Sequence, residues 1–190
     1  MKNIAVFASG SGSNARKLIE HFKNSPLARV TLVVCNKPGA GVLDIAREHG
    51  VEHMLIARHP FYDNDEFLHF LREKQIDFVV LAGFLWLAPE WLVKAYRGRI
   101  VNIHPALLPK YGGKGMYGMH VHEAVIAAGE KESGITIHHV DEHYDEGAAI
   151  FQASCPVEPG DTAADLAQKV QALEHRFFPE IVENLIKQAT

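Results

Sequence analysis

Short apolar runs alternate with amphipathic segments along most of the chain, and this alternation constrains the fold more than any other feature. Apolar runs that predict buried strands occupy residues 3–8, 29–35, 51–57, 77–84 and 99–104. Between them lie segments with apolar residues at helical spacing, of which 15–22, 42–50 and 65–75 are the clearest. Strands that alternate with helices in this way are typical of a mostly parallel sheet covered on both faces.

The last third of the chain adds a different kind of edge. Two apolar runs, 134–142 and 148–157, are joined by a short link and predict an antiparallel pair of strands. A long helix is expected from about residue 162, where Thr162 and Asp165 have the spacing of a capping box. The sequence therefore predicts an α/β fold: one Rossmann-like domain over residues 1–190, with a mostly parallel sheet, helices on both faces and an antiparallel edge.

Composition and charge limit the class of protein and its partners. Of the 190 residues, 47% are hydrophobic and 22% are charged, which is typical of a globular protein, and no long apolar stretch predicts a membrane span. The formal net charge is −4 and no basic block occurs, so nucleic acid is not expected as a partner. The N-terminal apolar run is too short for an export signal, and Cys35 and Cys155 lack metal-ligand spacing. We therefore expect a cytoplasmic protein with small-molecule ligands.

A loop rich in glycine and serine, "SGSGSNA" at 9–15, joins the first expected strand to the first expected helix. Glycines there let the backbone turn sharply, and the amides at the start of the helix can then bind an anion. The pattern Gly10-x-Gly12-x-x-Ala15 also fits a loose dinucleotide-binding fingerprint, which requires an acidic residue near the end of the second strand. The sequence at that place is "CNK" (35–37), without an acid, so we prefer a phosphate monoester as the ligand.

Asn102 and His104 stand two residues apart at the end of an expected buried strand, just before "PALLP". Side chains two apart on a strand share a face, and ligands bind at the carboxyl ends of parallel strands. A carboxamide N–H and a protonated imidazole would give a developing oxyanion two donors there. Such a histidine needs a neighbouring carboxylate to hold its proton near neutral pH. The candidates, among which pattern alone does not choose, are Asp141, Glu142, Asp145 and Glu146.

Five motifs together resemble the folate-dependent formyltransferases. The segment "NIHPALLPKY" is similar to the signature of that family, with Ala106 where serine is usual, and "YDEGAA" is similar to its Asp-x-Gly element. The segments "FASGSGSN", "VLAGF" and "VQALEH" match in the expected order, so the resemblance covers essentially the whole chain. It implies a transferase that moves the formyl group of 10-formyltetrahydrofolate, its co-substrate, to the amine of 5′-phosphoribosylglycinamide (GAR), without a metal.

The resemblance also implies a role for particular residues. Asn102 and His104 would polarise the formyl group, and Asp145 would raise the pKa of His104. The residues expected to hold the phosphate of GAR are Gly12, Ser13 and Asn14. Those expected to bind the rest of GAR are Leu85, Lys110 and Glu174. Those expected to bind the folate are Leu85, Trp86, Leu87, Ala88, Val93, Asn102, His138, Val140 and Asp141.

Two features depart from the family pattern. The glycine-rich segment 111–119 is several residues longer than usual, and we consider it as a lid or as a contact between subunits of a homodimer. A basic residue that many members use on the folate tail has no clear match near "YDNDEF", so none is assigned. The pairs His120-x-His122 and His138-His139, together with His143, are not expected to bind metal, because helix and strand geometry turns the members of each pair apart.

Three alternative functions remain open. A formyltetrahydrofolate hydrolase would use the same residues but would carry an extra N-terminal regulatory domain, whereas the first strand is expected at residue 3. A family member that formylates a transfer RNA would need a basic C-terminal domain. Outside the family, a nucleotide-binding module without catalysis would explain the glycines and would leave Asn102, His104 and Asp145 without a role.

Overall fold

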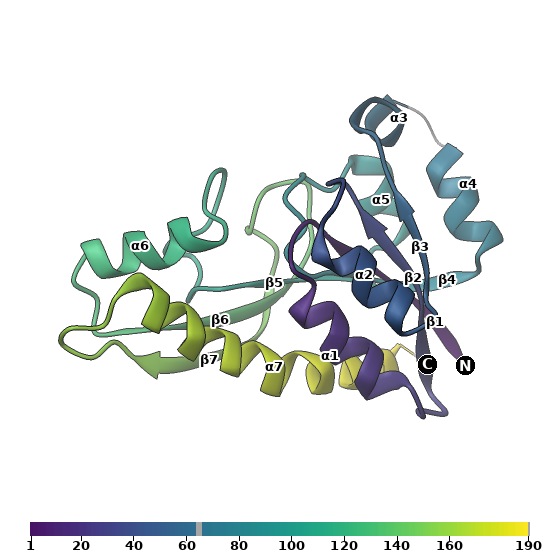
Figure 1. The fold of residues 1–190 in the computed structure, drawn as a ribbon. Helices are drawn as coiled ribbons and strands as arrows, with labels where there is room; N and C mark the ends of the chain where they lie inside the picture. Colours follow the sequence, from purple (N-terminus) through teal and green to yellow (C-terminus); the bar gives the residue numbers. More distant parts are fainter. Residues whose placement is uncertain (64–65, 190) are drawn as a thin grey trace.

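The computed structural model describes residues 1–63 and 66–189, and its centre is a single seven-stranded sheet (Figure 1). Its strands in spatial order are β3 (Glu52–Leu55), β2 (Ala28–Cys35), β1 (Lys2–Ala8), β4 (Ile76–Leu81), β5 (Ile100–His104), β6 (Glu132–His139) and β7 (Ala149–Pro156). Strands β1 to β5 are parallel, whereas β6 and β7 pair antiparallel. The predicted mostly parallel sheet with an antiparallel edge is confirmed.

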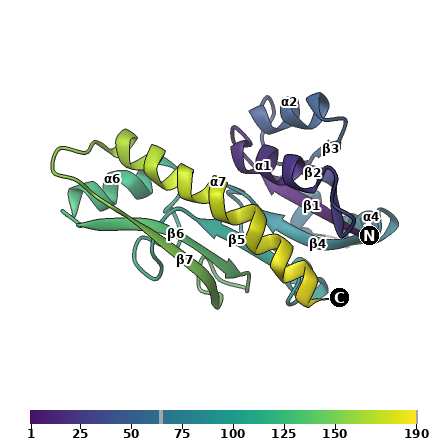
Figure 2. The same cartoon turned by 90° about the horizontal axis from the view of Figure 1, so that it is seen from below.

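Seven helices cover the two faces of the sheet in the described part of the chain. They are α1 (Ser13–Phe22), α2 (Gly41–Glu48), α3 (Arg58–Asp63), α4 (Glu66–Glu73), α5 (Glu90–Ala95), α6 (Met119–Ala127) and α7 (Ala163–Gln188). Helices α1, α2, α6 and α7 contribute to the core on one face, and α3, α4 and α5 to the core on the other. Figure 2 shows α7 lying across β5, β6 and β7. No helix among the described residues is both long and apolar enough to cross a membrane.

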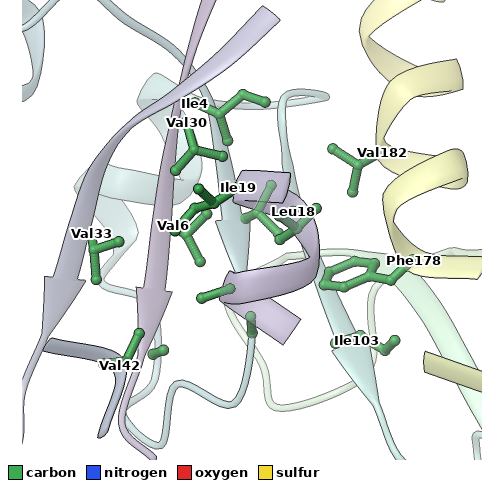
Figure 3. Close-up of a cluster of buried hydrophobic side chains, with 14 of the residues drawn as sticks. Ile4, Val6, Leu18, Ile19, Val30, Val33, Val42, Ile103, Phe178 and Val182 are labelled. Atoms are coloured by element: carbon green, nitrogen blue, oxygen red, sulfur yellow. The ribbon is translucent and has the colours of Figure 1, made fainter. Parts of the chain in front are cut away.

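The larger core joins the two ends of the chain. Leu18 of α1 and Phe178 of α7 are fully buried and belong to the same cluster as Val6 of β1 (Figure 3). Val42 of α2 is buried in this cluster directly beside the glycine-rich loop. The predicted capping box at the start of α7 is confirmed, because the side chain of Thr162 accepts a hydrogen bond from the amide of Asp165 at 3.2 Å and the reciprocal bond also forms.

Helix α3 was not expected from the sequence, and β3 is shorter than the predicted run 51–57. Phe61 explains the helix, since its fully buried ring contacts the rings of Phe7, Phe67, Trp86 and Trp91. These partners come from distant parts of the sequence, so the packing that stabilises α3 leaves no local pattern. The predicted helix at 65–75 corresponds to α4, and its first residue lies outside the described part of the chain.

The strand order places a ligand crevice at one end of the sheet. The order reverses between β1 and β4, and in open α/β sheets ligands bind outside the carboxyl ends of the strands at such a switch point. The loops that leave β1 and β4 are joined there, because the amide of Ser9 donates to the carbonyl of Gly83 at 3.0 Å and the amide of Leu85 donates to Oγ of Ser9 at 2.9 Å. The end of β5, with Asn102 and His104, borders the same crevice.

Candidate active site

The glycine-rich loop turns directly into the N-terminus of α1. Gly12 is the N-cap residue and has φ +81°, a left-handed conformation that favours glycine. A Cβ atom at this position would lie 2.7 Å from Cα of Val42, so a side chain is also excluded sterically. The carbonyl of Gly10 accepts a hydrogen bond from the amide of Val42 at 3.1 Å. Helix α2 therefore holds the loop in a shape that leaves the amides at the start of α1 free to bind an anion.

A cavity of about 550 Å³, here called the glycine-loop cavity, opens in front of these amides. Its walls come from residues 9–14, the loop after β4, the end of β5 and the first half of α7. Glu174 of α7 accepts a hydrogen bond from Nδ2 of Asn14 at 2.9 Å. Burial raises the pKa of the Glu174 carboxyl, and the bond from Asn14 opposes this shift. The side-chain oxygen Oδ1 of Asn14 is buried and has no partner among the described residues, so it is an acceptor without a protein donor.

A second cavity of about 410 Å³, here called the aromatic cavity, lies on the other side of Asn102. The segment Leu85, Trp86, Leu87 and Ala88 forms one wall, and His138 and Val140 of the antiparallel edge form another. The glycine-rich segment 113–117 closes a third side. A cavity that combines apolar and aromatic walls with several polar groups suits a flat organic ligand with polar edges.

The two cavities meet at the end of β5. Four residues line both of them, namely Phe84, Leu85, Asn102 and Tyr117. A ligand in each cavity would therefore approach the other beside the Asn102 side chain. This shared wall is the arrangement that a group transfer between two bound molecules requires.

The Asn102 amide group is part of a polar cluster. Its Nδ2 atom lies 3.0 Å from Nε2 of His138 and 3.3 Å from Oδ1 of Asp145. The Nδ1–H of His138 donates to the carbonyl of His139 at 2.8 Å. In the tautomer without a proton on Nε2, His138 accepts from Asn102, and both Asn102 N–H groups have acceptors. With a proton on Nε2, His138 instead faces Oδ1 of Asp145 at 3.5 Å as a donor. In the first case, an oxyanion stabilised by Asn102 must take one of the Asn102 N–H groups from its present acceptor.

His104 is almost completely buried, at 3% exposure, and lies behind the wall of the cavities. Its Nε2 donates to the carbonyl of Tyr111 at 2.7 Å, and its Nδ1 lies 3.5 Å from Oδ2 of Asp145. Burial has the largest effect and lowers the pKa of His104, whereas Asp145 and the Tyr111 carbonyl raise it. The direction predicted for the Asp145 contribution is confirmed. However, burial outweighs it, so His104 is predominantly neutral at pH 7 rather than a standing imidazolium.

Asp145 is the one of the four candidate carboxylates that the fold brings to Asn102 and His104. Burial alone would raise its pKa, but contacts with His138, His104 and the Gly113 amide outweigh burial and lower it. The Gly113 amide donates to Oδ2 at 3.0 Å. Asp145 has φ +58°, a strained conformation for a non-glycine residue of the kind that often marks functional sites. The turn is fixed by Gly147, where a Cβ would lie 1.8 Å from the carbonyl oxygen of His139.

The structure does not bring three of the predicted binding residues to either cavity. Val93 is 5% exposed and packs in the core of the second face, because it lies on the buried side of α5. The Lys110 ammonium pairs with Glu130 at 2.9 Å, and both residues line a separate cavity. The Asp141 carboxylate accepts a bond from the His143 amide at 2.9 Å, which keeps it outside the aromatic cavity. The binding roles of these three residues stay predictions, since the residues lie outside both cavity linings.

Arg58 is a cavity residue that the sequence did not reveal. It lines the aromatic cavity, and its guanidinium lies 5.5 Å from the ring centroid of Tyr62 and 5.8 Å from that of Trp86. It lies at the start of α3, a few residues before the segment "YDNDEF", where the sequence offered no basic residue. Ala106, which stands where the family signature usually has serine, is fully buried, and its backbone carbonyl accepts a hydrogen bond from the Thr136 hydroxyl at 2.7 Å.

Fold and site together define an α/β protein with an anion-binding loop, an adjoining aromatic cavity and an Asn–His–Asp cluster where the two cavities meet. The formyl transferase family model matches residues 2–182. The chain is 34% identical to phosphoribosylglycinamide formyltransferase of Bacillus subtilis, over 98% of this chain and 95% of that protein. It is 44% identical to the chloroplastic phosphoribosylglycinamide formyltransferase of Vigna unguiculata, over 98% of this chain, and spans 62% of that relative's length. The crystal structure of the enzyme of this name from Bacillus halodurans superposes with a TM-score of 0.88 at 41% identity, covering 100% of this chain and 97% of the other. The chain belongs to the formyl transferase family.

Proposed function

We propose that this chain transfers the formyl group of 10-formyltetrahydrofolate to the amine of 5′-phosphoribosylglycinamide, a step of purine biosynthesis. The observation that carries the proposal is the wall shared by the two cavities, which ends at Asn102 and backs onto His104 and Asp145. The relatives named above are phosphoribosylglycinamide formyltransferases, and two of them match this chain over nearly their whole length.

The glycine-loop cavity has the chemistry of a site for the phosphorylated substrate. Gly12, Ser13 and Asn14 present the N-terminus of α1 to the phosphate. Lys37 is the only lysine or arginine among the described residues that line this cavity, so the dianion depends largely on backbone amides and hydroxyls. Glu174 lies farther along the cavity and accepts hydrogen bonds from the ribose hydroxyls or the glycinamide part.

The aromatic cavity has the chemistry of a folate site. The backbone and side chains of residues 85–88 contact the pteridine, and His138 and Val140 cover its other side. Arg58 and Lys114 are the lysine and arginine side chains among the described residues that line this cavity, and they attract the glutamate carboxylates of the folate tail.

The residues at the junction then serve direct acyl transfer. The substrate amine attacks the formyl carbon, and an N–H of Asn102 stabilises the tetrahedral oxyanion. His104 is neutral at the start and is therefore able to accept the proton that the attacking amine must lose. The proton passes by way of the Asp145 side of the ring and a water molecule, since His104 itself does not line the cavities. Returning that proton to the departing nitrogen lets tetrahydrofolate leave as a neutral amine.

The direct test mixes the protein with 10-formyltetrahydrofolate and follows tetrahydrofolate release by absorbance, with and without the ribonucleotide. Release that depends on the ribonucleotide supports the proposal. Equal release in its absence identifies the hydrolase alternative. No release in either case, combined with saturable binding of NADH in a fluorescence titration, identifies the nucleotide-binding module.

Cellular location and assembly are further parts of the proposal. We place the protein in the cytoplasm, in a reducing environment that suits its two free thiols, Cys35 and Cys155. Fractionation of the source cells, followed by detection of the protein, tests this location. The partners we propose are the two small-molecule substrates. A homodimer stays a prediction, which sedimentation of the purified chain would test.

A further inference from the structure

Two histidines near the start of α6 have opposite environments. His120 has a side chain that is 63% exposed and lies 3.6 Å from Glu123, whereas His122 is only 5% exposed. The helix thus separates two residues that are close in sequence, as its periodicity requires. The ring of His122 lines the glycine-loop cavity together with Asn102, Pro105 and Glu174. None of the roles assigned above uses it.

The Nδ1 atom of His122 is buried and has no hydrogen-bond partner among the described residues. Buried polar side-chain atoms are paired in the large majority of cases, so an unpaired one beside a cavity calls for an explanation. Its neighbours on α6, Val121 and Val125, are buried hydrophobic residues that offer no partner to a ring nitrogen. A ligand or an ordered water molecule in the cavity is the remaining source of a partner.

Burial favours the neutral form of the His122 ring. Burial lowers its pKa, and the positive charge of a protonated His104 lowers it further. Glu174 lines the same cavity, and its own pKa is raised by burial. A neutral imidazole has one N–H donor and one acceptor nitrogen, so His122 is able to accept a hydrogen bond from a ligand.

The position of His122 in the cavity indicates which part of a bound substrate it would contact. A phosphate held at residues 12–14 fixes one end of the substrate at the start of α1. The far end of the same cavity is bordered by Asn102 and Pro105, and His122 lines the cavity with them. The amine and amide N–H groups of a phosphoribosylated glycinamide would lie here, beside the aromatic cavity.

We propose that His122 binds the glycinamide end of the substrate, with the neutral ring accepting a hydrogen bond from a substrate N–H and so directing the amine lone pair toward the formyl carbon. The inference rests on the proposed function and adds a binding residue from α6 to it. An amine nucleophile must present its lone pair to the carbonyl, and an acceptor that fixes one N–H restricts its rotation.

The test compares His122→Phe, His122→Asn and His122→Gln with the matched control His120→Gln on the same helix. Phenylalanine fills the space of the ring without an acceptor. Asparagine and glutamine place an amide oxygen near the positions of Nδ1 and Nε2, respectively. Calorimetric titration with GAR measures the affinity of the glycine-loop cavity for its ligand. Titration with tetrahydrofolate measures the affinity of the aromatic cavity, and a thermal melt checks the fold of each variant.

We expect His122→Phe to weaken GAR binding about tenfold, the usual size of one lost hydrogen bond, and to leave tetrahydrofolate binding unchanged. One of the two amide variants should recover most of the loss, and His120→Gln should match the wild type. The inference would be overturned by any of three results. His122→Phe binds GAR as tightly as the wild type, or it loses the same factor in affinity for GAR and for tetrahydrofolate, or neither amide variant recovers GAR affinity. If the phenylalanine variant does not fold, a difference in GAR affinity between the two amide variants supports the inference, and equal wild-type affinity overturns it. Absence of formyl transfer by the wild type would contradict the proposed function instead.

Discussion

Neutralising Asp145 should reduce turnover far more than it reduces stability. In Asp145→Asn the amide oxygen still accepts the bond from the Gly113 amide, so the loop keeps its anchor. The interaction that this variant loses is the attraction between the Asp145 carboxylate and the positive charge that His104 acquires during proton transfer. At the observed separation of 3.5 Å, an effective dielectric constant of about 20 gives an interaction of about 5 kcal/mol.

The charge on His104 is only partly developed in the transition state, so we expect about half of this interaction to appear in the barrier. Each 1.36 kcal/mol corresponds to a factor of ten, so a loss of about 2.5 kcal/mol predicts a fall in kcat of about 70-fold. The KM values for both substrates should change little, because Asp145 acts mainly on a charge that develops after binding.

The assay is the steady-state release of tetrahydrofolate at saturating concentrations of both substrates, with circular dichroism to confirm the fold. Glu146→Gln is the matched control: it removes one negative charge from the next residue in the chain, which is exposed. The control should retain wild-type kcat. Asp145→Asn with more than a tenth of wild-type kcat, or a control that loses as much activity as the variant, would refute the role given to Asp145.

Three other outcomes are expected. Gly12→Ala forces a left-handed residue against Val42 and should weaken GAR binding at least about tenfold, as measured by calorimetry; unchanged affinity would show that the loop shape is not needed. Arg58→Ala should raise the KM for a polyglutamylated folate more than the KM for the monoglutamate, and equal effects on both would exclude Arg58 from tail binding. The free energy of unfolding should decrease as the pH falls below 6.5, because the pKa values of His104 and His122 are lowered in the folded protein and the unfolded chain binds these protons more readily. Denaturant titrations at pH 7.5 and 5.5 measure this decrease. Equal free energies of unfolding at the two pH values would contradict it.

The sheet and the placement of Asn102 and His104 were predictable because their signals are local. Alternating apolar runs predict strands, and the two-residue spacing of Asn102 and His104 places both on one face of β5. The left-handed turn at Gly12 follows equally from the position of a glycine between a strand and a helix.

The remaining features depend on contacts between distant residues. Four carboxylates occupy one short loop, and only the turn at Gly147 decides that Asp145 faces the histidines. Lys110 follows the signature directly, yet its charge is satisfied by Glu130, twenty residues further along the chain. Arg58 reaches the aromatic cavity because the rings around Phe61 stabilise α3, an arrangement that no short segment encodes.

The most direct test of the central claim follows the formyl carbon itself. The protein is incubated with 10-formyltetrahydrofolate labelled with carbon-13 in the formyl group, together with GAR, and the products are analysed by mass spectrometry and carbon NMR. Direct acyl transfer predicts that the label appears as a formamide on the amine of the ribonucleotide, in amounts equal to the tetrahydrofolate released. Label recovered as free formate, with the ribonucleotide unchanged, would contradict the account.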